Sequence, residues 1–476
     1  MSHPDFDFSK IRDDSCLEAC NSRTWDLETY LNMKHTYVLL CSLALGLLAC
    51  QKDYNQAEAE NPEYLHRSVY ALNEIIIHDI FSPPVASRIY AYSSLAGFEA
   101  GRHADSTTQS LAGQIGWLTQ LPQPEAGQEY CFPLAGVHAF LTVGKALTFS
   151  EDMMDEFREG LYAEWKKKSG MRKDVFERSI AYGTAVGQAV MERTKTDNYK
   201  ETRTFPKFTV DESDPARWQP TPPDYKDAAE PHWSKIRPFT LDSAGQFLPP
   251  PPPKFDTSKG SPFYQKVEEV YHALDGADRA EREEIAYFWD DNPFVSHHAG
   301  HVMFADKKVT PGGHWMNIAM LASRMEKADY VKSSEAYLYT AIGLLEGFIS
   351  CWHGKYHYNL VRPETYINKY INQDWRPFLQ TPAFPEHTSG HSVISRASSA
   401  GLTYLYGENF AFKDTTNVEY GRTARSFKSF IQASDEASIS RLYGGIHYLP
   451  ALDLGAEQGR KVGLWIQQKI RTRRKE

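Results

Sequence analysis

The sequence predicts an all-α fold, and two observations support this. Apolar residues recur at helical spacing along most of the chain, as Val69, Leu72 and Ile76 do near its start. Strand-like alternation is hard to find in the N-terminal half, where prolines and glycines separate one helical stretch from the next. A chain of 476 residues that is 41% hydrophobic has enough apolar material for a large core.

The helical pattern can be followed element by element. After the first helical stretch it breaks at Pro83-Pro84, and it then predicts helices over 85–101, 135–147, 152–168 and 175–194. In the C-terminal half it predicts helices over 262–274, 279–289, 316–326, 334–360, 389–406, 412–433 and 449–471. Gly407 should end the helix that begins near Ser389, because glycine readily adopts the left-handed conformation that closes helices.

Three regions follow from this pattern. Residues 51–196 form an N-terminal helical region, 197–262 a proline-rich region, and 263–476 a C-terminal helical domain that holds the motifs described below. The proline run at 249–253 cannot lie inside a helix and favours polyproline II. We interpret the proline-rich region as a long loop over the surface rather than as a partner-binding segment.

The charge balance excludes one class of partner. The formal net charge of −9 argues against general nucleic-acid binding, which needs a basic face. Basic residues do gather at 469–475, but we interpret them as a solvated chain end.

The N-terminus carries a targeting pattern. An apolar run at 37–49 is too short for a membrane span of about 20 residues, but it suits a signal sequence. It ends in Leu47-Leu48-Ala49-Cys50, which resembles the lipobox of bacterial lipoproteins. We expect 1–32, which is polar and acidic, to be an extension from a mis-assigned start, 33–50 to be the signal, and Cys50 to be lipidated. The mature protein would then be lipid-anchored in the cell envelope, on the periplasmic or outer side; the alternative is a buried core helix.

One candidate anion site lies at Ser389-Gly390-His391, at the start of a predicted helix. A helix start presents unpaired backbone N–H groups and a partial positive charge. Gly390 allows a ligand to approach the backbone closely, and His391 offers a nucleophilic ring nitrogen.

Two further segments supply cations and a second histidine. Lys355 and Arg362 share a predicted helix face with Trp352, and Pro363 should place Arg362 at the helix end. In the other segment, Gly444-Gly445 supplies a bend that could direct Arg441 and His447 to one point. The alternatives are a solvated charged stripe and a structural histidine.

Together the three segments resemble a known signature. Lys-x6-Arg-Pro, Ser-Gly-His and Ser-Arg-x5-His match, in order and spacing, the superfamily that unites vanadium-dependent haloperoxidases and type 2 phosphatidic acid phosphatases. The family usually has proline before Ser-Gly-His, whereas this chain has Thr388, which affects the rigidity of the loop rather than its reacting atoms.

The resemblance implies roles for these residues. The cations would bind the oxygens of a tetrahedral oxyanion, with added hydrogen bonds from Ser389 and the Gly390 N–H; these cations are Lys355, Arg362 and Arg441. His447 would bond to vanadium in a haloperoxidase, or attack phosphorus in a phosphatase. His391 would be the acid–base histidine. The implied cofactor is vanadate, or phosphate in a phosphatase, with no nicotinamide, flavin or haem.

Flanking residues bear on the choice of reaction. Trp352 and Phe384 match aromatic positions near the halide in chloroperoxidase-type members, although ordinary core packing is an equal alternative. The segments 352–359 and 288–291 resemble soluble bacterial haloperoxidase homologues. No apolar run of 18 residues follows Cys50, which disfavours an integral lipid phosphatase and leaves a soluble acid phosphatase open.

Two accessory sites are weaker candidates. A carboxylate often orients the acid–base histidine in this family, and Asp291 is the candidate here, with Asp290 as its rival; a solvent-exposed pair at a helix end is the alternative. The cluster His297, His298 and His301 has an i,i+4 spacing suitable for a divalent metal, but it lacks the glutamate of a zincin.

The sequence therefore favours a vanadate-dependent haloperoxidase that uses hydrogen peroxide and halide. The first alternative is a metal-independent acid phosphatase that acts on phosphate esters through a phosphohistidine at His447. The second is a lipoprotein that binds oxyanions without turnover.

Overall fold

The computed structural model describes residues 54–116, 118–293, 295–299, 302–305 and 308–474. The extension 1–32, the signal 33–50 with its lipidation site at Cys50, and His301 all lie outside these residues. Within them, no helix is both long enough and apolar enough to cross a membrane.

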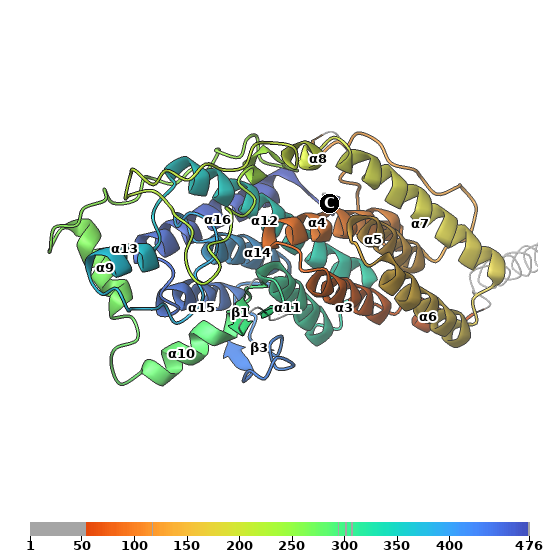
Figure 1. Cartoon of the computed structure of the whole chain (residues 1–476). Helices are drawn as coiled ribbons and strands as arrows, with labels where there is room; N and C mark the ends of the chain where they lie inside the picture. The colour runs from red at the N-terminus through yellow and green to blue at the C-terminus, as the bar shows by residue number, and fades with distance from the viewer. Residues whose placement is uncertain (1–53, 117, 294, 300–301, 306–307, 475–476) are drawn as a thin grey trace, which may run out of the picture. The chain divides into compact units, whose positions relative to one another are not determined.

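The prediction of an all-α fold is confirmed (Figure 1). The N-terminal half contains α2 (Gln56–Ala59), α3 (Glu63–His78), α4 (Pro83–Gly101), α5 (Phe132–Leu147), α6 (Glu151–Ser169), α7 (Lys173–Thr194) and α8 (Tyr199–Thr202). The C-terminal half contains α9 (Pro262–Tyr271), α10 (Arg279–Phe288), α11 (Pro311–Met325), α12 (Tyr330–Tyr358), α13 (Pro363–Tyr370), α14 (Gly390–Tyr406), α15 (Phe430–Tyr443) and α16 (Leu449–Lys469). Short 3-10 turns occupy Arg102–Ala104 and Trp233–Lys235.

The strands form two antiparallel hairpins. One pairs β1 (Ser296–Ala299) with β2 (Val302–Ala305), and the other pairs β3 (Phe412–Asp414) with β4 (Arg425–Phe427). The predicted helix over 412–433 is therefore wrong in its first part, since α15 begins only at Phe430. Asp414 instead accepts a hydrogen bond from the Thr416 backbone N–H at 2.9 Å, a local turn that competes with helix formation.

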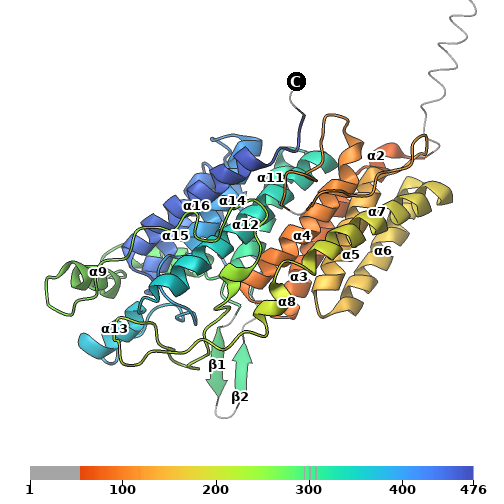
Figure 2. The ribbon, with the colours of Figure 1, turned by 90° about the horizontal axis from the view of Figure 1, so that it is seen from above.

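Helix α12 is the centre of the core. Buried side chains cover its whole circumference, as expected of a helix surrounded by others. It packs against α4 on one side and α14 on the other, and α16 covers α14 (Figure 2). Close approach needs glycine at two points: a Cβ at Gly343 of α12 would lie 3.1 Å from the Ala397 backbone, and one at Gly459 of α16 would lie 2.2 Å from the Val393 carbonyl oxygen.

The break between α12 and α13 differs from the prediction. Helix α12 ends at Tyr358, and Asn359 follows with a φ of 49°, in the left-handed region. Arg362 is the N-cap residue of α13 and not the last residue of α12, because Pro363 is tolerated in the first turn of a helix but not in the interior. Lys355 and Arg362 therefore come from two elements.

The proline-rich region is a long loop, as predicted, but it contributes to the core. Trp218 and Trp233 are fully buried. The Ala229 carbonyl accepts hydrogen bonds from the Trp352 indole at 3.2 Å and the Tyr356 hydroxyl at 2.7 Å, both on α12. The loop thus covers the end of α12 that carries Lys355.

Candidate active site

The three signature segments meet at one cavity. The end of α12, the start of α14 and the turn after α15 surround it. It is lined by Trp352, Phe384, Gly390, His391, Arg441 and His447, together with the segment 290–293, Phe348, Gln380, Pro382, Ile446, Pro83 and Pro311. Lys355, Arg362 and Ser389 lie directly behind this lining, through the contacts described below.

Lys355 is fully buried and holds the loop before α14. Its Nζ donates to the carbonyls of Pro385 at 3.0 Å, Glu386 at 3.1 Å and Thr388 at 2.5 Å. These bonds use the three donors of the ammonium group, so in this structure Lys355 supplies its charge to the cavity and its hydrogen bonds to the loop. Burial, reinforced by the charge of Arg362, lowers the pKa of Lys355 to about 7.

Arg362 is fully buried and has no carboxylate bonded to it. Its Nε donates to the Phe384 carbonyl and its Nη1 to the Ile446 carbonyl, each at 2.8 Å, while Nη2 has no hydrogen-bond partner. Its guanidinium carbon lies 4.9 Å from the centre of the Phe384 ring, and the Lys355 Nζ lies at the same distance. The ring thus stabilises both cations through its π-face.

Arg441 completes the cationic wall. It is 2% exposed, and its Nη2 donates to the Trp289 carbonyl at 2.5 Å. Its Nε donates to the neighbouring Ser440 hydroxyl at 2.9 Å. Burial lowers its pKa, partly offset by the charges of Asp290 and Asp291.

His447 has a defined tautomer. Its Nε2 lies 3.1 Å from Arg362 Nη1, and since a guanidinium can only donate, Nε2 must carry the lone pair. The proton is then on Nδ1, which donates to Glu386 Oε1 at 2.7 Å. Gly445, with a φ of 75°, provides the sharp turn that was predicted to bring His447 to the site.

Glu386 is the residue that sequence analysis missed. It is fully buried, and Oε1 also accepts the Tyr448 N–H at 3.0 Å, while Oε2 has no partner. Burial raises its pKa to about 7, and Arg362 and Lys355 oppose that rise. The signal was present in the sequence, because a lone carboxylate directly follows the apolar segment 383–385, shortly before Ser-Gly-His.

His391 presents a free ring nitrogen at the cavity. Its Nε2 is buried without a hydrogen-bond partner, so the hydrogen bond of the ring to the Trp289 backbone is assigned to Nδ1. Burial first, then the charges of Arg441 and His314, hold the pKa of His391 well below its usual value. Ser389 caps α14 by accepting the Ser392 N–H at 3.3 Å, and Gly390 begins the helix, as predicted.

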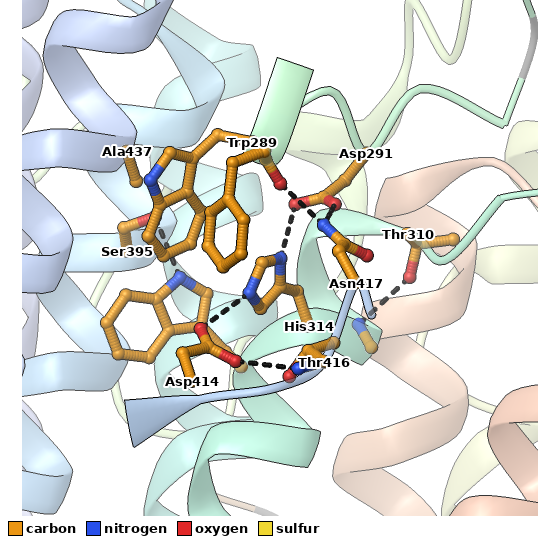
Figure 3. Close-up of polar contacts among 12 residues, drawn as sticks. Trp289, Asp291, Thr310, His314, Ser395, Asp414, Thr416, Asn417 and Ala437 are labelled. Atoms are coloured by element: carbon orange, nitrogen blue, oxygen red, sulfur yellow. Dashed lines mark hydrogen bonds and ion pairs between the residues drawn. The ribbon is translucent and has the colours of Figure 1, made fainter. Parts of the chain in front are cut away.

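Asp291 has a different partner from the expected one. Its Oδ2 lies 3.0 Å from Nδ1 of His314, which sequence analysis did not single out (Figure 3). His391 instead uses the Trp289 backbone. Asp290, the rival candidate, pairs with Lys308 at 2.8 Å. The alternative of a solvent-exposed pair is wrong for Asp291, which is 1% exposed.

The structure also shows the surroundings of Thr388 and the secondary structure at His297 and His298. Thr388, in the position where proline is usual, donates from its hydroxyl to Gln458 on α16 at 2.7 Å, so a hydrogen bond ties down the loop. His297 and His298 are consecutive residues of β1, where helical i,i+4 spacing does not apply. Among the described residues there is no cluster of three or more histidines, cysteines or carboxylates suited to a metal ion.

The chemistry of this donor set fits a tetrahedral oxyanion. Three buried cations surround the cavity. Glu386, beside Lys355 and Arg362, is bonded to His447, and Asp290 and Asp291 line the cavity near Arg441. Two buried polar atoms, Arg362 Nη2 and His391 Nε2, have no partner, and buried groups of this kind normally do. An anion with two or three negative charges would offset the cations and supply an acceptor for Arg362 Nη2, and a hydroxyl on the anion could donate to the lone pair of His391 Nε2. Vanadate has this shape and charge.

Comparisons with known proteins agree with this geometry. A family model described as the VCPO second helical-bundle domain matches residues 335–476. None of the curated proteins matches the chain. The crystal structure of a bacterial vanadium-dependent iodoperoxidase is similar, with 47% sequence identity and a TM-score of 0.82, over 88% of this chain and 98% of that one.

More distant structures share the fold. The holo and apo structures of a bacterial vanadium-dependent chloroperoxidase are 17% and 16% identical to this chain, with TM-scores of 0.62 and 0.63. Each comparison covers 82% of this chain and 94% or 95% of the other. Nearly half of the residues are identical to the iodoperoxidase over almost its whole length, so this chain belongs to the vanadium-dependent haloperoxidases.

Proposed function

We propose that this protein oxidises halide with hydrogen peroxide, using vanadate held at His447. The observation that carries the proposal is the cavity lined by His391, His447 and Arg441, with the buried cations Lys355 and Arg362 behind the lining and Arg362 Nη2 left without a partner. Bound vanadate would supply a Lewis-acidic centre that activates the peroxide. Iodide is the proposed halide, because the relative with 47% identity is an iodoperoxidase.

The protein's own residues would do three things in this reaction. The lone pair on His447 Nε2, fixed by the Nδ1–H bond to Glu386, would anchor the vanadium. Arg362 and Arg441 would bind oxygens of the anion, and Lys355 would add its charge. His391 Nε2 is neutral and unpartnered, so it can accept the peroxide proton; the Trp289 carbonyl keeps Nδ1 protonated and Nε2 free.

Trp352 and Phe384 would form the part of the cavity that binds the halide. The Trp352 and Phe384 rings lie 4.9 Å apart at the cavity, and the Trp352 indole N–H is bonded to Ala229. An apolar surface beside buried cations removes water from a large, weakly hydrated anion such as iodide while keeping it near positive charge.

The decisive assay uses the purified protein incubated with vanadate, peroxide and iodide, and separately with a chromogenic phosphate ester. We expect iodide oxidation that requires vanadate, and its loss in His447→Ala. Ester hydrolysis that vanadate inhibits, without halide oxidation, would instead establish the phosphatase alternative. Vanadate binding without either activity would establish the non-catalytic one.

A lipid anchor is a separate proposal. The Leu47-Leu48-Ala49-Cys50 pattern supports processing at Cys50 and attachment to the cell envelope by lipid alone. Mass spectrometry of the N-terminal peptide from the native host tests this. A diacylated Cys50 is expected, and recovery of residues 1–32 on the mature protein would refute it.

A further inference from the structure

A second buried cluster lies behind the wall of the cavity. His314, near the start of α11, is fully buried between two carboxylates: its Nδ1 lies 3.0 Å from Asp291 Oδ2 and its Nε2 lies 2.9 Å from Asp414 Oδ2 (Figure 3). The segment after α10 supplies Asp291, and β3 supplies Asp414. Neither carboxylate is more than 1% exposed.

This geometry sets the charge of the ring. A neutral imidazole has one N–H and can donate to only one carboxylate, whereas the imidazolium donates to both. With a neutral ring, one of the two Oδ2 atoms would face a ring lone pair instead of an N–H, which is costly in a buried site. The two Asp contacts outweigh the desolvation of the ring and raise the pKa of His314 to about 10, so the ring is a cation at neutral pH.

The cluster contacts Trp289 and the following segment 290–293, which forms one wall of the cavity. The Trp289 ring stacks on His314 with centroids 4.5 Å apart and planes 15° apart. Asn417 donates to the Phe288 carbonyl at 2.5 Å and to Asp291 Oδ1 at 3.3 Å, which fastens the same segment from the β3–β4 side. The backbone around Trp289 is therefore held from two directions.

The Trp289 backbone holds two side chains of the active site in place. The Trp289 carbonyl accepts from Arg441 Nη2 at 2.5 Å and from His391 Nδ1. It therefore fixes the guanidinium that faces the anion and the tautomer of the acid–base histidine. His314 also acts through space, because its charge lowers the pKa of His391.

We propose that His314, held as an imidazolium between Asp291 and Asp414, is a positioning residue of the active site that fixes the Trp289 carbonyl and keeps His391 neutral. The proposal rests on the proposed function, since it gives the role of residues behind the oxyanion cavity. It also gives Asp291 a role through His314. The titratable groups that face His314 are Asp291 and Asp414, with His391 beyond the Trp289 segment.

The first test is His314→Gln in the full-length protein. The variant loses the cation and one of the two donors, so the Trp289 carbonyl should shift. We expect vanadate affinity, measured by calorimetry, to fall on the order of 10–100-fold, as is typical when a supporting residue of a metal site is removed. The acid limb of the kcat/KM pH profile should move to higher pH, because His391 would bind a proton more readily.

Asp414→Asn separates charge from geometry. The amide can donate to Nε2 of a neutral His314, whose Nδ1–H still donates to Asp291, so both hydrogen bonds survive without the cation. We expect this variant to retain most of its vanadate affinity, and its acid limb to move to higher pH by less than that of His314→Gln, because the substitution also removes the negative charge of Asp414. If His314→Gln does not fold, the vanadate affinity and the acid limb of Asp414→Asn still test the proposal.

His138→Gln is the matched control. His138 on α5 is also buried and uses both ring nitrogens, contacting the Tyr162 hydroxyl at 2.6 Å and Thr184 Oγ1 at 2.8 Å, but these belong to the N-terminal half. It should lose stability without a change in vanadate affinity or acid limb. Unchanged affinity and an unshifted acid limb in both cluster variants would overturn the positioning role. A wild-type protein that binds no vanadate would overturn the proposed function itself.

Discussion

Two buried arginines show how the N-terminal bundle differs from the candidate active site. On α4, Arg88 donates from Nε to Asp197 Oδ2 at 2.7 Å and from Nη2 to the Thr194 carbonyl at 3.3 Å. At the active site, Arg362 donates to the carbonyls of Phe384 and Ile446 and leaves Nη2 without a partner. Arg88 has its counter-ion within the chain, and Arg362 has no carboxylate bonded to it.

The difference identifies where an anion belongs. A buried cation is stable when a carboxylate and hydrogen bonds replace its water. Arg88 is stabilised in this way, and burial without a bonded carboxylate lowers the pKa of Arg362 to about 10. The Arg88–Asp197 pair thus stabilises the fold. Arg362 is less stable because it lacks a bonded carboxylate, and a bound oxyanion would supply the missing negative charge.

The largest expected effects come from removing each arginine in turn. Arg88→Met leaves Asp197 buried without its bonded cation, which should cost about 3–5 kcal/mol of unfolding free energy. Arg362→Met removes a charge that lacks a bonded carboxylate, so its cost should be well below that of Arg88→Met. Denaturant unfolding of both variants gives the two values.

Vanadate sharpens the same comparison. It should raise the Tm of the wild type and of any folded Arg88→Met protein, because binding to the native state stabilises it, but it should not raise the Tm of Arg362→Met. Equal destabilisation by the two substitutions, with vanadate stabilising both, would remove the distinction between the arginines.

A second expected effect concerns pH. Without an anion the pKa of Lys355 is about 7, below its usual value, so Lys355 loses its proton as the pH rises above 7. Binding a dianion favours the charged form and takes up a proton, so affinity for tungstate, a tetrahedral dianion, should fall from pH 7 to pH 9, by up to about tenfold per unit. Glu386, with a pKa raised to about 7, gains negative charge over the same range and acts in the same direction.

Calorimetric titration at several pH values measures this dependence. Lys355→Met should bind tungstate more weakly and with a flatter pH profile, since only Glu386 still titrates. An affinity for the wild type that stays constant over this range would contradict the assigned charge state of Lys355.

The smallest expected effect concerns the loop before α14. Thr388→Val leaves Gln458 Oε1 without its donor and should cost about 1–3 kcal/mol in denaturant unfolding. Thr403→Val on α14 is the control, because the Thr403 hydroxyl has no hydrogen-bond partner and its loss should cost little. Equal costs for the two variants would show that the Thr388 bond does not hold the loop.

Local pattern was enough to predict most helices, because apolar spacing and caps are properties of neighbouring residues. Helix α14 begins at Gly390 and ends before Gly407 as predicted, since Ser389 and Gly407 are its caps. The first part of the helix predicted over 412–433 is instead β3 and β4, where Asp414 forms a local turn with Thr416 and also contacts His314, a hundred positions away. Pairing of that kind leaves no periodic trace in the sequence.

Only the site residues that belong to the three-segment motif were brought together from the sequence. Resemblance brought together Lys355, Arg441 and His447, which three separate elements supply. It gave no information on Glu386 or His314, because their roles depend on which side chains face them after folding. Asp291 was singled out as a carboxylate near the site, but its partner became evident only from the distances around His314.

The most direct test is a crystal structure of the protein saturated with vanadate. We expect vanadium bonded to Nε2 of His447, with Nη2 of Arg362 donating to an oxygen of the anion and the Nδ1 bond to Glu386 retained. Vanadate bound elsewhere, or a saturated crystal in which Arg362 still donates to His447 Nε2, would contradict it.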